Sequence, residues 1–388
     1  MSPWVVPPTS KYRCRAARVH ENCRFRHFLT SPNRALDLRP AEPQATSILD
    51  SVDAHDPPRW RPGPPLAGRI KTIPDDFRVD EIPVYEPSGD GEHLFVRFRK
   101  TDLTTPRAVD ALCRALGASK REAGWAGMKD RHAVTTQWVS LFGVQPEAAL
   151  AAEVEGIEIL EAIPHERKLK TGHLRGNRFE LRVREVDDPD ALVEALAALQ
   201  VVPSYFGTQR FGRDNLERAS AWLVDGGRPP RDRVQKRFLV SALQAAVFNS
   251  VVAERVRTRR LASVIEGDVL QTQRGGIFGA DEDPEAQGRV DSGEVMPTAP
   301  LPGKDVRWAT GEAGELERAA AEVWKIDDAA MGRMGKLGRG TRRGVLVRPV
   351  ELEASREGDD VRVAFALPSG CYATVVMREV LGSVTSAD

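Results

Sequence analysis

Cysteine is scarce in this chain, and its distribution argues against a disulfide framework. Only four cysteines occur in 388 residues, at Cys14, Cys23, Cys113 and Cys371, and none belongs to a CxxC pair. Scattered single cysteines of this kind are typical of proteins in a reducing compartment. We therefore expect a cytoplasmic protein.

An excess of charge of one sign is also missing, as are long apolar runs. Lys and Arg total 56 and Asp and Glu total 56, so the formal net charge is +0. A large unspecific attraction to a polyanion is therefore not expected, and any such attraction must come from local charge separation. No apolar run approaches the length of a membrane span, and the N-terminus lacks the apolar core of a signal peptide. We expect no membrane partner.

The first 65 residues differ in composition from the rest of the chain. They are rich in Pro and Arg and show no sustained helix or strand period. We interpret 1–65 as a disordered extension, and a translation start placed too far upstream would look the same. Cys14, His20, Cys23 and His27 fit no closed zinc site well, so we predict no metal there.

The region after Gly68 alternates between strand and helix patterns. Strands are predicted at 69–72, 77–84, 93–99, 134–142, 157–163 and 179–186, and helices at 105–116 and 190–199. Gly117 is the predicted stop of the first helix. Strands that pair with intervening helices predict an α+β sheet domain.

The composition changes after Pro203, which predicts a second domain, as a length of 388 residues also does. Residues 236–256 have apolar side chains at helical spacing, and 281–294 is acidic and is predicted to be a solvated loop. Two basic segments flank this region, at 228–237 and 333–348. Basic stripes with glycines suit phosphate backbones, although charge alone fits a solvated face equally well. Strand alternation returns from about residue 351.

The stretch from Ala126 to Thr135 is the most informative part of the chain. It reads AGMKDRHAVT and places one carboxylate, Asp130, among the basic side chains of Lys129, Arg131 and His132. An Asp in such a loop is ordinarily an ion-paired surface residue. A reactive carboxylate is the other interpretation of Asp130. It requires a fixed loop, and the strand predicted directly after the loop can fix it.

Five ordered motifs resemble the TruD family of transfer-RNA pseudouridine synthases. The longest is GMKDRHAVTTQW at 127–138. The others are KTIPDDF at 71–77 with Glu81, RGNRF at 175–179, VPSYFGTQRFG at 202–212, and LPSGCYAT at 367–374 with Arg378 and Glu379. The resemblance covers residues 66 to 383 and is specific because the motifs agree in both type and order.

The resemblance implies a fold and a domain organisation. We expect a pseudouridine synthase catalytic domain at 66–202 and 350–388, with a central mixed, mostly antiparallel sheet flanked by helices. An inserted α/β domain particular to the family is expected at 203–349. With no repeat and no coiled-coil seam in the sequence, we expect a monomer without an obligate protein partner.

The implied activity is the isomerisation of uridine 13 in the D arm of tRNA to pseudouridine. This reaction neither gains nor loses atoms, so no cofactor and no metal is expected, in keeping with the missing nucleotide-binding motifs. A covalent attack at C1′ and a glycal-type route stay open. The alternative is a catalytically silent RNA-binding or RNA-folding module of the same fold. A metal-dependent nuclease would need a carboxylate or histidine cluster that the sequence does not offer.

The resemblance also assigns site residues. Asp130 is the implied catalytic carboxylate, and Lys71 is the implied cation beside it. Lys129 and Arg131 are less suited to that pairing, because neighbours in an extended segment point to opposite faces. Phe77, Asn177, Phe179 and Tyr372 are expected to bind the target base, although the family usually has phenylalanine where Tyr372 stands. Lys129 and Arg131 are expected either to anchor the loop or to contact RNA phosphates. Arg339 and Arg342 are further candidates for RNA contact, while His132 is expected to be structural.

Overall fold

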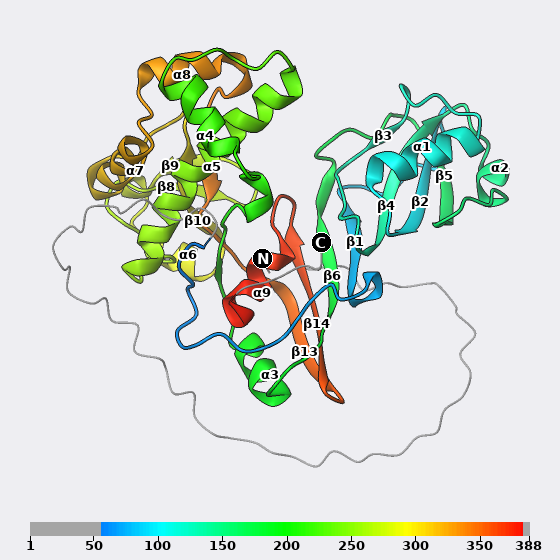
Figure 1. Cartoon of the computed structure of the whole chain (residues 1–388), viewed down its shortest axis with the longest axis horizontal. Helices are drawn as coiled ribbons and strands as arrows, with labels where there is room; N and C mark the ends of the chain where they lie inside the picture. Colours follow the sequence, from blue (N-terminus) through cyan, green and yellow to red (C-terminus); the bar gives the residue numbers. More distant parts are fainter. Residues whose placement is uncertain (1–55, 383–388) are drawn as a thin grey trace.

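The computed structural model describes residues 56–382 (Figure 1). Residues 1–55 and 383–388 lie outside the described part of the chain. The weak zinc candidates Cys14, His20, Cys23 and His27 therefore lie outside it too. The described chain forms an eight-stranded sheet, a four-stranded sheet, a two-stranded sheet and the helices that cover them.

The large sheet has eight strands in the order β13-β14-β6-β1-β4-β2-β5, with β3 paired to β4. Only the β1–β4 pair in this sheet is parallel, which confirms the predicted mixed, mostly antiparallel arrangement. Its strands are β1 (Phe77–Pro83), β2 (His93–Thr101), β3 (Gly124–Trp125), β4 (Val134–Phe142), β5 (Ile157–His165), β6 (Leu174–Val183), β13 (Val350–Glu357) and β14 (Asp360–Pro368).

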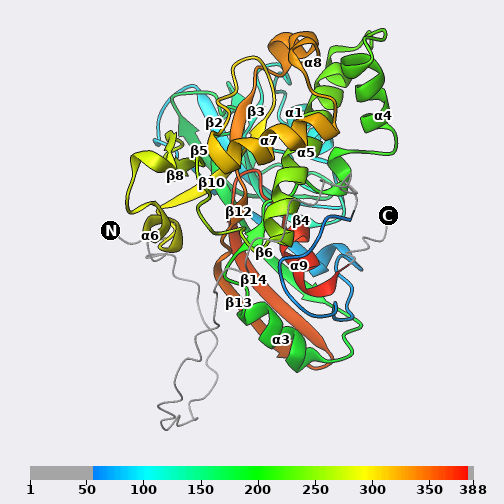
Figure 2. The same ribbon diagram turned by 90° about the vertical axis from the view of Figure 1, so that its left-hand side faces the viewer.

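Helices cover this sheet over two separate apolar clusters. The helices are α1 (Thr105–Ala115), α2 (Pro146–Leu150), α3 (Pro189–Ala197) and α9 (Ala373–Leu381), and the short 3-10 turn η1 spans Pro74–Asp76. Leu112 of α1 packs with β2 and β4, while Leu196 of α3 and Val380 of α9 pack with β1, β6 and β14. Figure 2 shows α3 against the β13–β14 hairpin, at the far end of the molecule from α8.

The small sheet lies within the chain segment between β6 and β13. Its order is β11-β10-β8-β9, and all its pairs are antiparallel. Its strands are β8 (Val269–Thr272), β9 (Ile277–Gly279), β10 (Val295–Leu301) and β11 (Thr341–Gly344). The accompanying helices are α4 (Asn215–Ala219), α5 (Arg233–Arg257), α6 (Ala286–Asp291), α7 (Gly311–Val323) and α8 (Asp328–Met334). The π-helix η3 (Ser220–Val224) follows α4, and short 3-10 helices are η2 (Thr208–Arg210), η4 (Ala280–Glu282) and η5 (Gly335–Leu337).

The chain enters and leaves this segment side by side. β7 (Val202–Pro203) pairs antiparallel with β12 (Leu346–Val347), so both ends of the segment meet at one place. A segment whose ends meet can be inserted into a sheet without disturbing it. We propose 203–349 as an inserted domain between 66–202 and 350–388.

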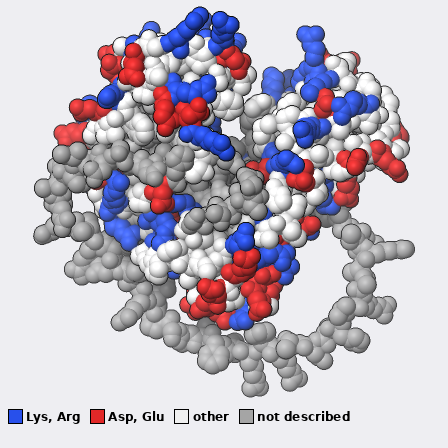
Figure 3. Space-filling model, in the orientation of Figure 1, with Lys and Arg blue, Asp and Glu red and all other residues white. Residues whose placement is uncertain are grey.

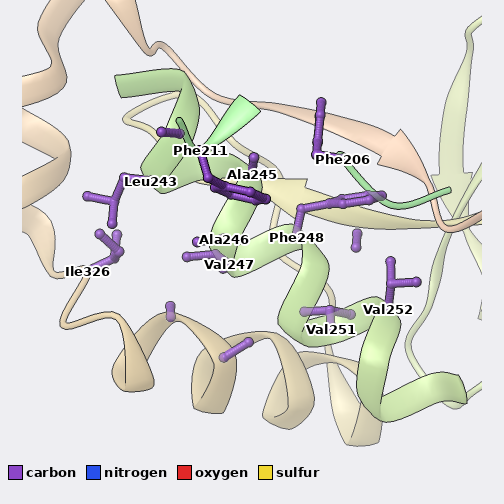
Figure 4. Packing of buried hydrophobic residues seen from close by; sticks show 14 of the residues in the cluster. Phe206, Phe211, Leu243, Ala245, Ala246, Val247, Phe248, Val251, Val252 and Ile326 are labelled. Atoms are coloured by element: carbon purple, nitrogen blue, oxygen red, sulfur yellow. The ribbon is translucent and has the colours of Figure 1, made fainter. Parts of the chain in front are cut away.

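Helix α5 forms the core of the inserted segment. Asp232 caps its start by accepting from Val234 N and Gln235 N, and its later turns are buried on nearly every side. Figure 4 shows Phe248, Val247 and Leu243 packed with Phe206 and Phe211. By length and apolarity α5 could span a membrane, contrary to our expectation, but 83% of its apolar window is buried within the protein. That burial is typical of a core helix.

Three local predictions need correction. Residues 56–65, assigned to the extension, pack against α9: Glu379 Oε2 accepts from Trp60 N at 2.7 Å and Arg61 N at 2.8 Å. The acidic segment 281–294 is no simple loop, because it contains most of η4 and all of α6. Residues 69–72 form no strand beyond one bridge from Arg69 to Arg184.

Candidate active site

Asp130 lies in the loop between β3 and β4 and pairs with Lys71. The Lys71 Nζ donates to Asp130 Oδ2 at 2.8 Å. The side chain of Lys71 is 8% exposed and that of Asp130 is 41% exposed. A buried cation thus orients a carboxylate that stays open to a ligand, and Lys71, the predicted partner, makes this contact.

The main chain and ring contacts of Lys71 fix its ammonium. Lys71 has φ 59°, a left-handed conformation that costs a non-glycine residue about 1 kcal/mol or more. Its Nζ also lies 4.1 Å from the centroid of the Phe77 ring. Strained backbone of this kind persists where surrounding contacts over-determine it, and here the result is a cation held against Asp130.

Lys129 points away from the Asp130 carboxylate and into the protein. Its Nζ forms an ion pair with Glu81 of β1, and the two side chains are 4% and 2% exposed. Glu81 Oε1 also accepts from Trp138 N at 3.3 Å. The predicted RNA contact by Lys129 is therefore wrong, and its anchoring role is what the geometry supports.

The next two residues of the loop face solvent and Asp102. Arg131 is 63% exposed, with Nε 3.5 Å from Asp102 Oδ1, and His132 Nδ1 lies 3.8 Å from the same oxygen. Arg131 stays a candidate for RNA contact. His132 contacts Asp102 rather than Asp130, as expected of a structural residue.

Sheet register brings three of the predicted base-binding residues onto one face. Glu81 of β1 lies opposite Asn177 of β6, and Phe77, four residues before Glu81 on the same strand, lies opposite Leu181. Side chains of directly opposed residues project to the same side, and so do those of alternate residues along a strand. Phe77, Asn177 and Phe179 therefore share the face on which Glu81 holds the Asp130 loop.

The two phenylalanines form a wall rather than an open stacking surface. Phe77 is 2% exposed and Phe179 is 6% exposed, and their ring centroids lie 6.1 Å apart in an edge-on arrangement. One neighbour of Phe77 is already Lys71. Both rings are too buried to stack directly on a base, so the expectation that Phe77 and Phe179 bind the target base is corrected to packing behind the site.

Asn177 has a hydrogen-bond acceptor left without a partner in the described part of the chain, and Tyr372 is partly exposed. The Asn177 Oδ1 is buried and has no hydrogen-bond partner among the described residues. Beside it, Gly176 must be glycine, because a Cβ would lie 2.2 Å from Leu367 O. Tyr372 is 37% exposed, and its hydroxyl accepts from Arg210 Nη2 at 3.4 Å. Asn177 therefore presents an unused acceptor, and Tyr372 presents an open ring.

The two arginine candidates of the inserted segment are engaged within the protein. Arg342 is buried, with its guanidinium paired to Glu317 and donating from Nε to Thr298 Oγ1 at 2.7 Å. Its predicted RNA contact is wrong. Arg339 is 75% exposed and pairs with Asp305 at 2.7 Å, so it is accessible but already neutralised.

A different basic group in the inserted segment is unpaired. The group consists of the five cations Arg228, Arg231, Arg233, Lys236 and Arg237. None of them makes an ion pair with another described residue, and all except Lys236 are exposed. Figure 3 shows Lys and Arg side chains on both sides of the hollow between the lobe of α4, α5 and α8 and the lobe of β1 to β5. The basic segment 228–237 therefore has charge free for a polyanion.

Two further residues form hydrogen bonds with the main chain of the Asp130 loop, and the sequence motifs did not identify them as site residues. Thr105 Oγ1 accepts from Lys129 N at 3.0 Å, and Lys100 Nζ donates to Asp130 O at 2.7 Å. The one sequence signal for Lys100 was its position at the end of a strand pattern whose alternate residues are apolar, where a lysine is unusual. No group of three or more His, Cys, Asp or Glu in residues 56–382 could hold a metal ion.

Comparisons with known proteins identify the family of this chain. The family model of tRNA pseudouridine synthase D (TruD) matches residues 61–226 and 232–380. This chain belongs to the TruD family. A TruD-family relative, the tRNA pseudouridine synthase D of Anaeromyxobacter dehalogenans (strain 2CP-1), is 43% identical over 328 residues, which is 82% of this chain and 93% of that protein. The protein of the same name from Photobacterium profundum is 38% identical over 330 residues, covering 82% and 92%.

A solved TruD-family structure has the same fold. The crystal structure of the putative tRNA pseudouridine synthase D from Methanosarcina mazei superposes with a TM-score of 0.68 at 22% identity. The match covers 85% of this chain and 97% of that one. The fold is thus that of a TruD protein.

Proposed function

We propose that this protein is a tRNA pseudouridine synthase that isomerises uridine 13 in the D arm of tRNA, with Asp130 as the reacting carboxylate. The observation that most supports this proposal is the Lys71–Asp130 pair, in which a buried ammonium orients a half-exposed carboxylate. The curated relatives bear the name of this activity.

The reaction breaks the bond from C1′ to N1 of uracil, turns the base, and joins C1′ to C5. The proton on C5 is then lost, and N1 gains one, so the product is an isomer of the substrate. A carboxylate at C1′ can assist either by attacking C1′ or by removing the C2′ proton on a glycal-type route. Both routes need an ionised carboxylate held in place, which is the arrangement of Asp130.

The target base must leave the RNA stack to reach Asp130, which costs a few kcal/mol. The unpartnered Asn177 Oδ1 suits this step, because a carbonyl acceptor can bind the N3–H of uracil. The open ring of Tyr372 can stack on the extruded base and return about 1–3 kcal/mol. Phe77 and Phe179 would support the site from behind.

The basic segment 228–237 is the proposed contact for the RNA backbone. Folded RNA is recognised mainly through its shape and phosphates, which requires cations that are not neutralised within the protein. Charge reversal at Arg228, Arg231 and Arg233 should lower the salt slope of tRNA binding by about 0.7–0.9 for each phosphate that the protein no longer neutralises. Arg356→Glu, on the distant β13–β14 hairpin, is the control. An unchanged salt slope of tRNA binding in the triple variant would show that 228–237 is a solvated surface that does not contact RNA.

Tritium release from uridine labelled at C5 in tRNA tests the activity. The wild type should release tritium and Asp130→Asn should not, while both bind tRNA with similar affinity. Activity in Asp130→Asn would remove the carboxylate from the mechanism. Tight binding by an inactive wild type would favour the alternative, a silent RNA-binding or RNA-folding module.

A further inference from the structure

Lys100 is an unusual residue for its place in the sheet. On β2 it continues the buried face of Leu94, Val96 and Phe98, because alternate residues of a strand project to one side. Its side chain is fully buried, with 0% exposure. Burying an ammonium in an apolar layer is costly unless the charge has a specific partner.

That partner is the main chain of the catalytic loop. Lys100 Nζ donates to the carbonyl oxygen of Asp130 at 2.7 Å, and no described carboxylate lies within ion-pair distance of it. A buried ammonium held only by a carbonyl does little for folding, because the desolvation cost exceeds what one hydrogen bond returns. The bond does fix the position of the Asp130 peptide.

Thr105 provides the matching contact on the other side of the loop. Its Oγ1 accepts from Lys129 N at 3.0 Å and donates to Gln137 Oε1 at 2.9 Å. The Lys129–Asp130 main chain is thus bound at its N–H by α1 and at its C=O by β2. Two bonds on opposite ends of a dipeptide fix its orientation as well as its position.

Three charged groups and burial affect the pKa of Lys100. Asp130 and Asp102 favour its ammonium, Lys129 opposes it, and burial has the largest effect and lowers the pKa of Lys100 to about 8. Below that pH the residue is an ammonium beside the Asp130 peptide. Above it, the amine is neutral and its grip on the carbonyl is weaker.

We propose that Lys100 is a positioning residue, whose ammonium holds the Asp130 carbonyl so that the carboxylate meets C1′ of the target nucleoside. This inference rests on the proposed function of Asp130. Lys100 does not touch the substrate, since it is buried beneath the loop. Its loss should therefore lower kcat and leave the KM for tRNA unchanged, because the RNA-binding surface is not altered.

The test compares Lys100→Met with wild type and with Lys168→Met as a matched control. Lys168 Nζ also donates to a main-chain carbonyl, that of Arg121 at 2.8 Å, but outside the catalytic loop. Single-turnover rates and KM are measured from pH 6 to 10 by C5 tritium release, together with unfolding by urea. Lys100→Met should lose about a hundredfold in kcat, the usual cost of misplacing a reacting group by about 1 Å.

The pH profile separates positioning from folding. With a pKa of about 8, roughly a tenth of wild-type Lys100 stays charged at pH 9, so wild-type kcat should fall there with an unchanged KM. Lys100→Met should lack this alkaline fall and keep or exceed wild-type stability, while Lys168→Met should match the wild type. Loss of folding in Lys100→Met, wild-type kcat, or a retained alkaline fall would each overturn the proposal.

The failure of this proposal can be told apart from the failure of the proposed function. If Asp130→Asn stays active, the assignment of the carboxylate fails, whatever Lys100 does. If Asp130→Asn is inactive while Lys100→Met behaves as wild type, only the positioning role is overturned.

Discussion

Breaking the buried ion pair between Lys129 and Glu81 should destabilise the protein much more than breaking an exposed pair of the same sheet. Both side chains are almost fully buried, at 4% and 2% exposure. Removing one partner leaves the other charge buried without compensation, which costs about 3–5 kcal/mol. We expect that loss of unfolding free energy for Lys129→Met and for Glu81→Gln.

The double variant gives the sharper result. Lys129→Met with Glu81→Gln leaves no uncompensated charge, and the neutral glutamine side chain keeps an acceptor for the main-chain N–H of Trp138, which donates to Glu81 at 3.3 Å. Its cost should be smaller than that of either single change. A coupling of about 3 kcal/mol or more between the two positions follows, at the upper end of the range for residues in direct contact.

Urea unfolding at pH 7 measures these differences. The control is Arg97→Met with Glu161→Gln, a pair of β2 and β5 whose side chains are 36% and 32% exposed. Such exposed pairs contribute less than about 1 kcal/mol. Lys129→Met could instead lower the unfolding free energy by less than about 1 kcal/mol and also lower the salt slope of tRNA binding. Lys129 would then contact solvent and RNA phosphate, and the buried Lys129–Glu81 ion pair would be refuted.

The remaining predictions concern other parts of the molecule. Lys71→Ala should reduce the single-turnover rate about a hundredfold and change tRNA affinity little, because it orients Asp130; equal losses in rate and binding would contradict that role. Arg342→Met should lower the unfolding free energy by about 3–5 kcal/mol, because it leaves the buried Glu317 carboxylate without its ion-pair partner. The salt slope of tRNA binding should stay unchanged. Removal of residues 1–65 should lower the urea midpoint below that of the protein lacking 1–55, because the longer deletion also removes the contacts of 56–65 with α9.

Much of the fold was predictable because its signals are local. The β2 segment places apolar residues at alternate positions, Leu94, Val96 and Phe98, and the β4 segment is rich in Thr, Val and aromatic residues. Helix α1 begins at Thr105-Pro106 and ends before Gly117, which has φ 63°. The acidic segment 281–294 was misjudged because α6 is short and is stabilised by tertiary contacts of Ala286 and Val290 rather than by its own sequence pattern. Residues 56–65 were misjudged because α9, to which they bind, follows some 300 residues later.

The sequence alone determined the family, because the family resemblance depends on ordered motifs of residue type. That resemblance implied the pairing of Asp130 with Lys71, and the structure contains this pair. Only the tertiary structure decided which basic residues are free. Lys129 and Arg342 look like RNA contacts in the sequence, but strands and helices far along the chain bring Glu81 and Glu317 against them. Likewise, only the packing of β2 under the loop reveals Lys100. Burial is set by non-local strand and helix contacts, so charge in a sequence does not show whether that charge reaches solvent.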